Sequence, residues 1–294
     1  MFKSIIYKSL IPFSKVESLI QRENLKVLAY HTVPDSLAFE RQLTYLKKHY
    51  NIVGVLDLVN NMDSLHRLPQ NSLLITFDDG DYSVYEKGLP LLVKYDIPSV
   101  LFVITDLIGT REDFWWKQIE RYFKSKGDTY KNARSKINEL KKSTNKARES
   151  YLRSLPKFDY LQLNSEQLRE CQSKGMYVGN HTASHPMIDQ CTEEEVREEL
   201  SKAKMAFEEI GLPGYSIFAY PNGNWDAVSE KILDQKDIKL AFLFDHKINR
   251  SSKNFNPMRI SRIRVSTNTS IDEFKVKVSG LHSRLMYLKN KIKA

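Results

Sequence analysis

The sequence predicts an α/β protein in which parallel strands are covered by helices. Seven short apolar or β-branched runs recur along the chain, at 25–30, 72–77, 99–104, 176–180, 216–220, 239–244 and 262–266. The runs are continuously apolar rather than alternating, which is typical of parallel strands buried on both faces. Helical patterns separate them at 37–50, 85–95, 165–174 and 192–210. This order of elements favours an α/β barrel or an open α/β sheet.

The helix expected at 192–210 has clear boundary signals. Thr192 precedes the acids Glu193 to Glu195, which is typical of a capping box at a helix start. Gly211 and Pro213 follow the last apolar position and indicate a stop.

The alternation of strands and helices pauses between 111 and 164. This stretch opens with the aromatic cluster Phe114, Trp115 and Trp116 and continues as a helix pair rich in Lys and Glu. We interpret it as a helical insertion in the main domain, because too few apolar residues remain there for a core of its own. Residues 117–150 hold eleven Lys or Arg and four acids. Without aromatic residues after Tyr130, this charge favours a solvated helix surface over a nucleic-acid groove.

Composition excludes several classes of protein. The 294 residues are 41% hydrophobic and 28% charged, enough to bury a sizeable core, which excludes disordered and low-complexity chains. The N-terminus lacks the unbroken apolar stretch of a signal peptide, and no run of 18 apolar residues occurs anywhere. We therefore expect a cytoplasmic protein without a membrane-spanning helix.

Both ends of the chain are expected to be helical. Residues 1–24 place apolar side chains at roughly helical spacing with lysines between them, and residues 271–294 form a basic C-terminal helix. The N-terminal helix either lies on an anionic membrane surface or packs its apolar face on the barrel beside the C-terminal stretch. Pro12 interrupts the pattern and weakens the case for a long surface helix.

Chemically active residue types follow the predicted strands at their C-terminal ends, where α/β proteins bind ligands. Asp78 and Asp79 come directly after the second long run, and burying two adjacent carboxylates requires a compensating cation or hydrogen bonds. His181 and His185 follow the run at 176–180, at a spacing that lets two imidazoles share one metal. Two His and one carboxylate leave open positions on Zn²⁺ or a similar ion.

A third strand end carries the sequence Tyr220, Pro221, Asn222 and Gly223. The Pro-Asn-Gly part is first of all a turn. Placed opposite a metal, the same turn would also present backbone N–H groups, which are the donors that an oxyanion needs.

These motifs together resemble the NodB-homology polysaccharide deacetylases of carbohydrate esterase family 4. TFDDG at 76–80 and HTASHP at 181–186 are similar to the first two family motifs. FAYPNG at 218–223 is similar to the third, in the form seen in the branch that modifies exopolysaccharides. YHTV at 30–33 and RISRI at 259–263 also resemble that branch, so the likeness covers about residues 25 to 270.

The resemblance implies a distorted (β/α) barrel with a divalent metal, usually zinc, held by Asp79, His181 and His185. Asp78 matches the catalytic base of the family, and the backbone N–H of Asn222 falls where the family helps to bind the oxyanion. Family substrates are N- or O-acetylated sugars. This assignment agrees with the chemistry of amide hydrolysis, in which a metal activates water and polarises the carbonyl while a neighbouring carboxylate accepts the proton.

Two positions depart from the family pattern. Many members carry Arg where this chain has Ala219, and that Arg usually orients the base. The late Leu-x-His motif that supplies a catalytic acid has only an imperfect candidate at Leu281 and His282. His31 and His246 follow strands and are better placed, and we assign the acid to His31.

We therefore expect a metal-dependent deacetylase of an acetamido sugar in a bacterial surface glycan or its lipid-linked precursor. The alternatives are an O-deacetylase or an amidohydrolase of a non-sugar amide, and a catalytically silent glycan-binding member. The expected partner is a glycan or lipid-linked sugar, not a nucleic acid, with possible peripheral contact to the inner membrane face.

Overall fold

Eight parallel strands form the central sheet of the computed structural model, which describes residues 2–251 and 255–293. The strands are β1 (Lys26–Tyr30), β2 (Asn51–Ile52), β3 (Ser72–Phe77), β4 (Ser99–Val103), β5 (Met176–Asn180), β6 (Ile217–Ala219), β7 (Leu240–Phe242) and β8 (Ile263–Arg264). Their order is β7-β6-β5-β4-β3-β1-β8, with the short β2 beside β3. All seven strands predicted from apolar runs are confirmed, and β2 was not predicted.

The sheet curls until its two edges approach each other. Ile263 pairs with Leu28 of β1, and Ile260, three residues earlier, forms a parallel bridge with Phe242 of β7. The segment before β8 therefore joins both edges of the sheet, which confirms the distorted (β/α) barrel.

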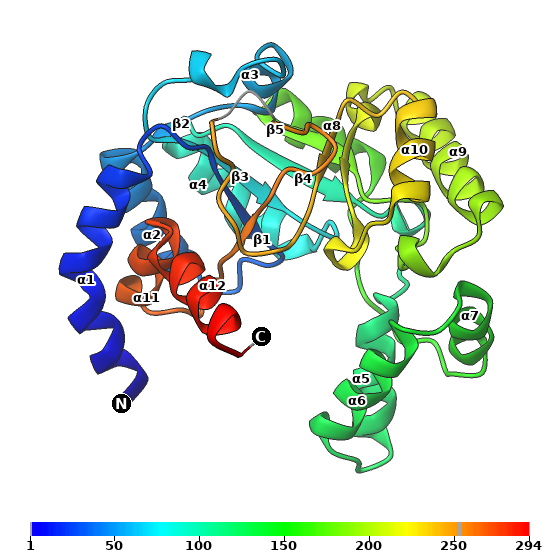
Figure 1. Ribbon diagram of the computed structural model, residues 1–294. Coiled ribbons are helices and arrows are strands. Elements are labelled where there is room, and N and C mark those ends of the chain that lie inside the picture. Colours follow the sequence, from blue (N-terminus) through cyan, green and yellow to red (C-terminus); the bar gives the residue numbers. More distant parts are fainter. Residues whose placement is uncertain (1, 252–254, 294) are drawn as a thin grey trace.

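Helices cover the outside of the barrel (Figure 1). They are α2 (Ser36–His49), α3 (Val55–Val59), α4 (Leu89–Lys94), α8 (Ser165–Ser173), α9 (Glu193–Ile210) and α10 (Ala227–Gln235). The capping box of α9 forms as predicted, because Thr192 accepts from Glu195 N while the Glu195 carboxylate accepts from Thr192 N. The helix expected at 85–95 is divided into a π-helical turn, Val84–Gly88, and α4. Pro90 explains this break, since it has no N–H to donate to the preceding turn.

Apolar side chains fill both faces of the sheet. In β1, Leu28 and Tyr30 pack with Phe39 and Leu43 of α2, in the core between sheet and helices. Val27, which precedes Leu28 and points to the other face of the strand, belongs to a second cluster, made by alternate positions of the other strands and by α3. Burial on both faces is why the strands read as continuous apolar runs.

The segment 111–164 projects from the barrel as a small helical lobe (Figure 1). It contains three helices, α5 (Trp115–Ser125), α6 (Tyr130–Leu140) and α7 (Asn145–Arg153), rather than the expected pair. Ile119, Ile137 and Leu140 form a small apolar cluster inside it. The same cluster includes Met187, from the loop after β5, so the few apolar side chains of the segment pack together with a residue of the main domain.

Helices at both ends of the chain lie side by side at the β1–β8 edge of the barrel (Figure 1). The C-terminal segment forms two helices, α11 (Ile271–Val278) and α12 (Leu281–Lys293), rather than one. Helix α1 (Phe2–Ile20) packs along α11, with Tyr7 against Val276 and Leu281. Within the described residues, no helix is both long enough and apolar enough to cross a membrane.

Candidate metal centre

Three potential metal ligands converge at the C-terminal ends of β3 and β5. Nε2 of His181 lies 3.4 Å from Oδ1 of Asp79, and Nε2 of His185 lies 3.6 Å from the same oxygen. All three side chains are buried, and one ligand atom from each lies within 4.8 Å of the others. One carboxylate oxygen and two imidazole nitrogens are a donor set that suits Zn²⁺ and similar divalent ions. The three predicted ligands are therefore brought together.

The backbone at these motifs adopts conformations that non-glycine residues rarely occupy. Asp79, Thr182, His185 and Asn222 all have positive φ, between 58° and 74°. Such left-handed residues cost free energy and persist where the surrounding structure fixes them. At this site they turn the chain sharply after each strand, so that the functional side chains face one another.

His181 is oriented by the third motif. Its Nδ1 lies 2.8 Å from the carbonyl oxygen of Ala219, which only accepts hydrogen bonds. Nδ1 therefore carries the proton, and the unprotonated Nε2 faces Asp79. The backbone carbonyl of Ala219 thus orients a predicted metal ligand.

His185 is held by the helical lobe as well as by its own loop. Its N–H donates to Oγ1 of Thr182 at 2.9 Å, and its carbonyl accepts from the buried guanidinium of Arg148 on α7 at 3.2 Å. Trp116 packs on the imidazole with ring centroids 4.7 Å apart. Burial lowers the pKa of His185 well below its usual value, and the nearby His181 and Arg148 lower it further. The imidazole is therefore neutral at pH 7, which is the form that binds metals.

Glu199 on α9 fixes the loop between the two histidines. Its carboxylate accepts from the backbone N–H groups of Ala183 and Ser184, at 2.9 and 2.8 Å, and from the Ser184 hydroxyl at 2.7 Å. Burial raises the pKa of Glu199, and these hydrogen bonds act in the opposite direction. Sequence reasoning missed both Glu199 and Arg148, because no local motif connects them to the histidines.

Arg262 is the charged partner of Asp78. It is fully buried, and its two terminal nitrogens donate to the two carboxylate oxygens of Asp78 at 2.6 and 2.8 Å. Its Nε donates to the Leu243 carbonyl at 2.7 Å, which fixes the guanidinium plane. Burial acts to raise the pKa of Asp78, but Arg262, with His181 and His31, outweighs burial and holds this pKa below its usual value. Asp78 is therefore an ionised, positioned carboxylate beside Asp79.

A cavity of about 180 Å³ contains the predicted catalytic residues together with the three ligands. Asp78, Asn222 and His31 all line it, and the His31 ring lies edge-on to Phe244 with centroids 5.3 Å apart. His246 packs on Phe244 but is not among the lining residues. His282 lies near Tyr7 of α1, 6.4 Å between ring centroids, and is also not among them.

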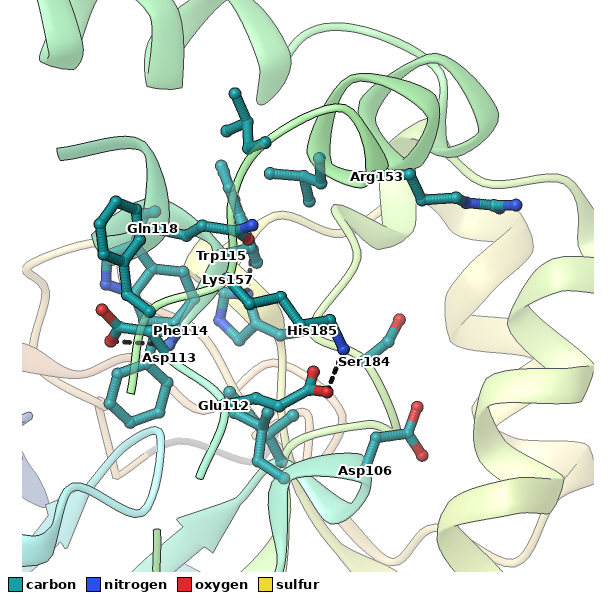
Figure 2. A pocket seen from close by; sticks show the side chains of 16 residues that line it. Asp106, Glu112, Asp113, Phe114, Trp115, Gln118, Arg153, Lys157, Ser184 and His185 are labelled. Carbon is teal, nitrogen blue, oxygen red and sulfur yellow. Dashed lines mark hydrogen bonds and ion pairs between the residues drawn. The ribbon is translucent and has the colours of Figure 1, made fainter. Parts of the chain in front are cut away.

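A second cavity, of about 410 Å³, lies on the other side of His185, between the barrel and the lobe. Figure 2 shows Phe114, Trp115 and His185 among its lining residues, together with the ion pair of Glu112 and Lys157. The lobe aromatics therefore separate this cavity from the candidate metal centre.

A sequence model of a known family, described as polysaccharide deacetylase, matches residues 66–241, which is more than half of the chain. The chain belongs to the polysaccharide deacetylase family. The matched region contains five of the six predicted site residues, with His31 outside it.

Curated relatives match a shorter stretch. Poly-beta-1,6-N-acetyl-D-glucosamine N-deacetylase of Staphylococcus aureus (strain N315) is 37% identical over 71 residues, or 24% of each chain. The protein of the same name from Staphylococcus epidermidis is 33% identical over 85 residues, or 29% of each. The match thus spans about a quarter of the length of these relatives.

Solved structures show the same fold over most of the chain. IcaB from Ammonifex degensii has a TM-score of 0.61 at 22% identity, covering 87% of this chain and 97% of its own. The Streptococcus pyogenes deacetylase PplD, in complex with acetate, has a TM-score of 0.60 at 20% identity, with coverages of 87% and 98%. A de-N-acetylase from Aggregatibacter actinomycetemcomitans has a TM-score of 0.61 at 17% identity, with coverages of 86% and 99%.

Proposed function

We propose that this family member is a metal-dependent N-deacetylase acting on an amino sugar of a bacterial surface polysaccharide or its lipid-linked precursor. The observation that carries the proposal is the placement of Asp78, ionised and held by Arg262, in one cavity with Asp79, His181 and His185. The names of the staphylococcal relatives support an N-acetylglucosamine polymer as the class of substrate.

A divalent metal held by Asp79, His181 and His185 would lower the pKa of a bound water to about 7 and polarise the acetamide carbonyl. Asp78 accepts the proton of the attacking water. The two hydrogen bonds from Arg262 occupy one lone pair on each carboxylate oxygen of Asp78, so a second lone pair on each oxygen remains for that proton.

The remaining roles fall to residues on the other sides of the cavity. We assign stabilisation of the oxyanion to the Asn222 backbone N–H and protonation of the departing amine to His31, because both residues line the cavity. These two assignments complete the proposed acid–base machinery.

Acetate release from acetylated amino-sugar oligomers and lipid-linked sugars, with and without a chelator, tests the proposal. We expect chelation to abolish release and added Zn²⁺ to restore it. Release only from O-acetylated sugars, or only from small non-sugar amides, would instead identify an O-deacetylase or an amidohydrolase. Glycan binding without release would identify a silent member, although such a protein needs no base beside its metal.

Two variants separate metal binding from chemistry. His181→Ala should lose both the stoichiometric metal and activity, whereas the exposed His66→Ala should keep both. Asp78→Asn should keep the metal but lower kcat by ~10²–10⁴, with the exposed Asp63→Asn as its control. Near-parental turnover of Asp78→Asn would reject the assigned base, and a tightly held metal in His181→Ala would reject the ligand set.

A further inference from the structure

The cavity of the candidate metal centre has a positively charged wall. Arg134 on α6, Lys141 at the C-terminal end of α6 and Arg264 on β8 line it together with the predicted ligands. The lobe and the closing strand therefore bring three cations to one side of a small site.

Acidic partners do not balance these cations. Nζ of Lys141 donates to Oδ1 of Asn222 at 2.5 Å, and the Arg264 guanidinium lies 5.9 Å from the Phe244 ring centroid. Arg134 has a carboxylate within 4.0 Å, that of Glu120 at 3.7 Å. Within residues 2–251 and 255–293, no ion pair within 4.0 Å is found for Lys141 or Arg264.

The two acids that line the cavity already have other partners or roles. The negative charge of Asp78 is balanced by the guanidinium of Arg262, to which it is joined by two hydrogen bonds. Asp79 belongs to the candidate metal ligands. Burial lowers the pKa of Lys141, and the charges of Arg134 and Arg264 lower it further, although Asp79 opposes this. Lys141 is half-buried and Arg264 is exposed, but the three like charges line one small cavity, where a bound anion would relieve their mutual repulsion.

We propose that the sugar substrate carries an oxyanion, as a phosphate or a carboxylate, close to the acetamido group. The inference rests on the proposed function, because it places the acetamide between the metal ligands and Asn222. Lys141 contacts Asn222, and Arg264 lies over the Phe244 ring. A sugar whose acetamide is bound beside Asn222 would therefore have its remaining part close to Lys141 and Arg264. A neutral acetamido sugar would leave Lys141 and Arg264 without an ion-pair partner among the described residues.

Arg264→Gln is the primary test variant, because Lys141 also touches Asn222. kcat/KM is measured for an N-acetylated amino sugar in neutral, 1-phosphate and carboxylate-bearing forms, and calorimetry measures binding of inorganic phosphate and pyrophosphate. We expect the parent to prefer an anionic form by at least ~10-fold and Arg264→Gln to remove most of that preference through KM. The exposed Lys146→Gln is the matched control and should change neither quantity.

The outcomes separate the two proposals. Equal kcat/KM for neutral and anionic sugars in both parent and Arg264→Gln would overturn the oxyanion while leaving the deacetylase intact. No acetate release from any form would overturn the proposed function itself. Preference for the phosphate or the carboxylate form alone would identify the source of the charge.

A different observation concerns the two terminal helices. Helix α1 packs on the barrel through Tyr7, Ser14 and Glu17, which are nearly buried. Beside this buried side, α1 exposes apolar side chains at helical spacing, namely Ile6 (45%), Phe13 (63%), Val16 (57%), Leu19 (69%) and Ile20 (58%). Helix α12, which contacts α1, exposes Leu285, Met286, Tyr287 and Leu288. We call the exposed apolar residues of these two contacting helices the terminal-helix surface, and they are nine of the sixteen exposed large apolar side chains among the described residues.

Basic residues accompany this surface. Lys8 and Lys15 flank the apolar stripe of α1, and Lys289 and Lys291 are exposed on α12. Glu17 is the only acid in either helix, and it is buried and bonded to Arg284 at 2.8 Å. An apolar stripe with basic flanks and no exposed acid matches the requirements of an anionic bilayer surface.

We infer that the terminal-helix surface binds anionic membranes peripherally. A bilayer is favoured over a second copy of the chain, because two-fold pairing would place these basic flanks against each other. Such docking would hold the barrel at the membrane, where lipid-linked sugars are found.

Sedimentation with vesicles tests the inference on the full chain. Phosphatidylglycerol-containing vesicles should bind the parent in a salt-sensitive manner, and pure phosphatidylcholine vesicles much less. Phe13→Ser with Ile20→Ser should reduce binding by at least ~10-fold, whereas Leu37→Ser, at a 67% exposed position on α2, should not. Circular dichroism checks that the variants are folded. Absence of salt-sensitive binding, or a concentration-dependent dimer that the double variant dissolves, would overturn the inference.

Discussion

The pair of Asp78 and Arg262 shows how single side chains determine this site. The two residues are 184 positions apart in the sequence, and both are almost completely buried. A buried carboxylate is expensive without a partner, and two parallel hydrogen bonds from a guanidinium provide one with fixed geometry. Arg262 also donates hydrogen bonds to the Thr76 hydroxyl and the Leu243 carbonyl. The proposed base is therefore held in place by the barrel itself.

Replacing Arg262 with Met should therefore affect stability and turnover together. We expect a loss of about 3–5 kcal/mol in the free energy of unfolding, measured by urea denaturation, because an unpaired carboxylate stays buried. Adding Asp78→Asn should recover part of that loss, since the stranded charge is removed. The contrary result is that Asp78→Asn lowers the free energy of unfolding by the same amount in the parent and in Arg262→Met. In that case the two side chains do not act as a pair.

At the scale of elements, two helices outside the motifs support the loop that carries His185. Helix α9 supplies Glu199 beneath the backbone N–H groups of Ala183 and Ser184, and α7 supplies Arg148 to the His185 carbonyl. The lobe is thus part of the structure that orients a candidate metal ligand. Groups that orient ligands in this way tune metal affinity without touching the metal.

Glu199→Ala should leave the buried N–H of Ala183 and the part-buried N–H and hydroxyl of Ser184 without their acceptor. We expect metal affinity, measured by competition with a chromophoric chelator, to fall by ~10–100-fold while the helical circular dichroism signal is retained. The adjacent Glu198→Ala is the matched control, because Glu198 is 60% exposed and pairs only with Lys202. Equal affinities of the two variants would show that Glu199 has no part in positioning the histidines.

At the scale of the whole molecule, the barrel buries a lysine where α1 enters β1. Lys26 is fully buried, and its Nζ donates to the Gln21 carbonyl at 2.9 Å, just beyond the end of α1. Burial lowers its pKa from 10.5 to about 8, and Glu17 partly opposes this shift. Docking of α1 and closure of the barrel edge are therefore linked to the protonation of one side chain.

This shift predicts a pH dependence of global stability. Between pH 8 and about 10 the unfolded chain keeps the Lys26 proton while the folded protein loses it, so the free energy of unfolding should rise with pH. The slope due to Lys26 is roughly 1 kcal/mol per pH unit. Lys26→Met, compared with the parent by urea denaturation from pH 7 to about 9.5, should lack that contribution. Parallel stability curves for the two proteins would contradict the assignment.

The sequence by itself determined the strands, the boundaries of α9, and the metal and base candidates. Strands buried on both faces must be apolar throughout, and the turns after β3 and β5 concentrate Asp78, Asp79, His181 and His185 in short strings. Motifs of this kind can be predicted because their residues are neighbours in the sequence. The two-residue β2 was missed because a strand of that length has no periodic signal.

Only the tertiary structure decided what surrounds those strings. Arg262 reaches Asp78 because the segment before β8 closes the barrel between β7 and β1, and no local pattern records that closure. Glu199 and Arg148 look like ordinary charges of polar helices until packing buries them against the histidine loop. The basic residues of α6 read as a solvated face, yet the orientation of the lobe turns Lys141 into the cavity. The physical reason is the same in each case, because long-range contacts depend on how elements pack and not on residue spacing.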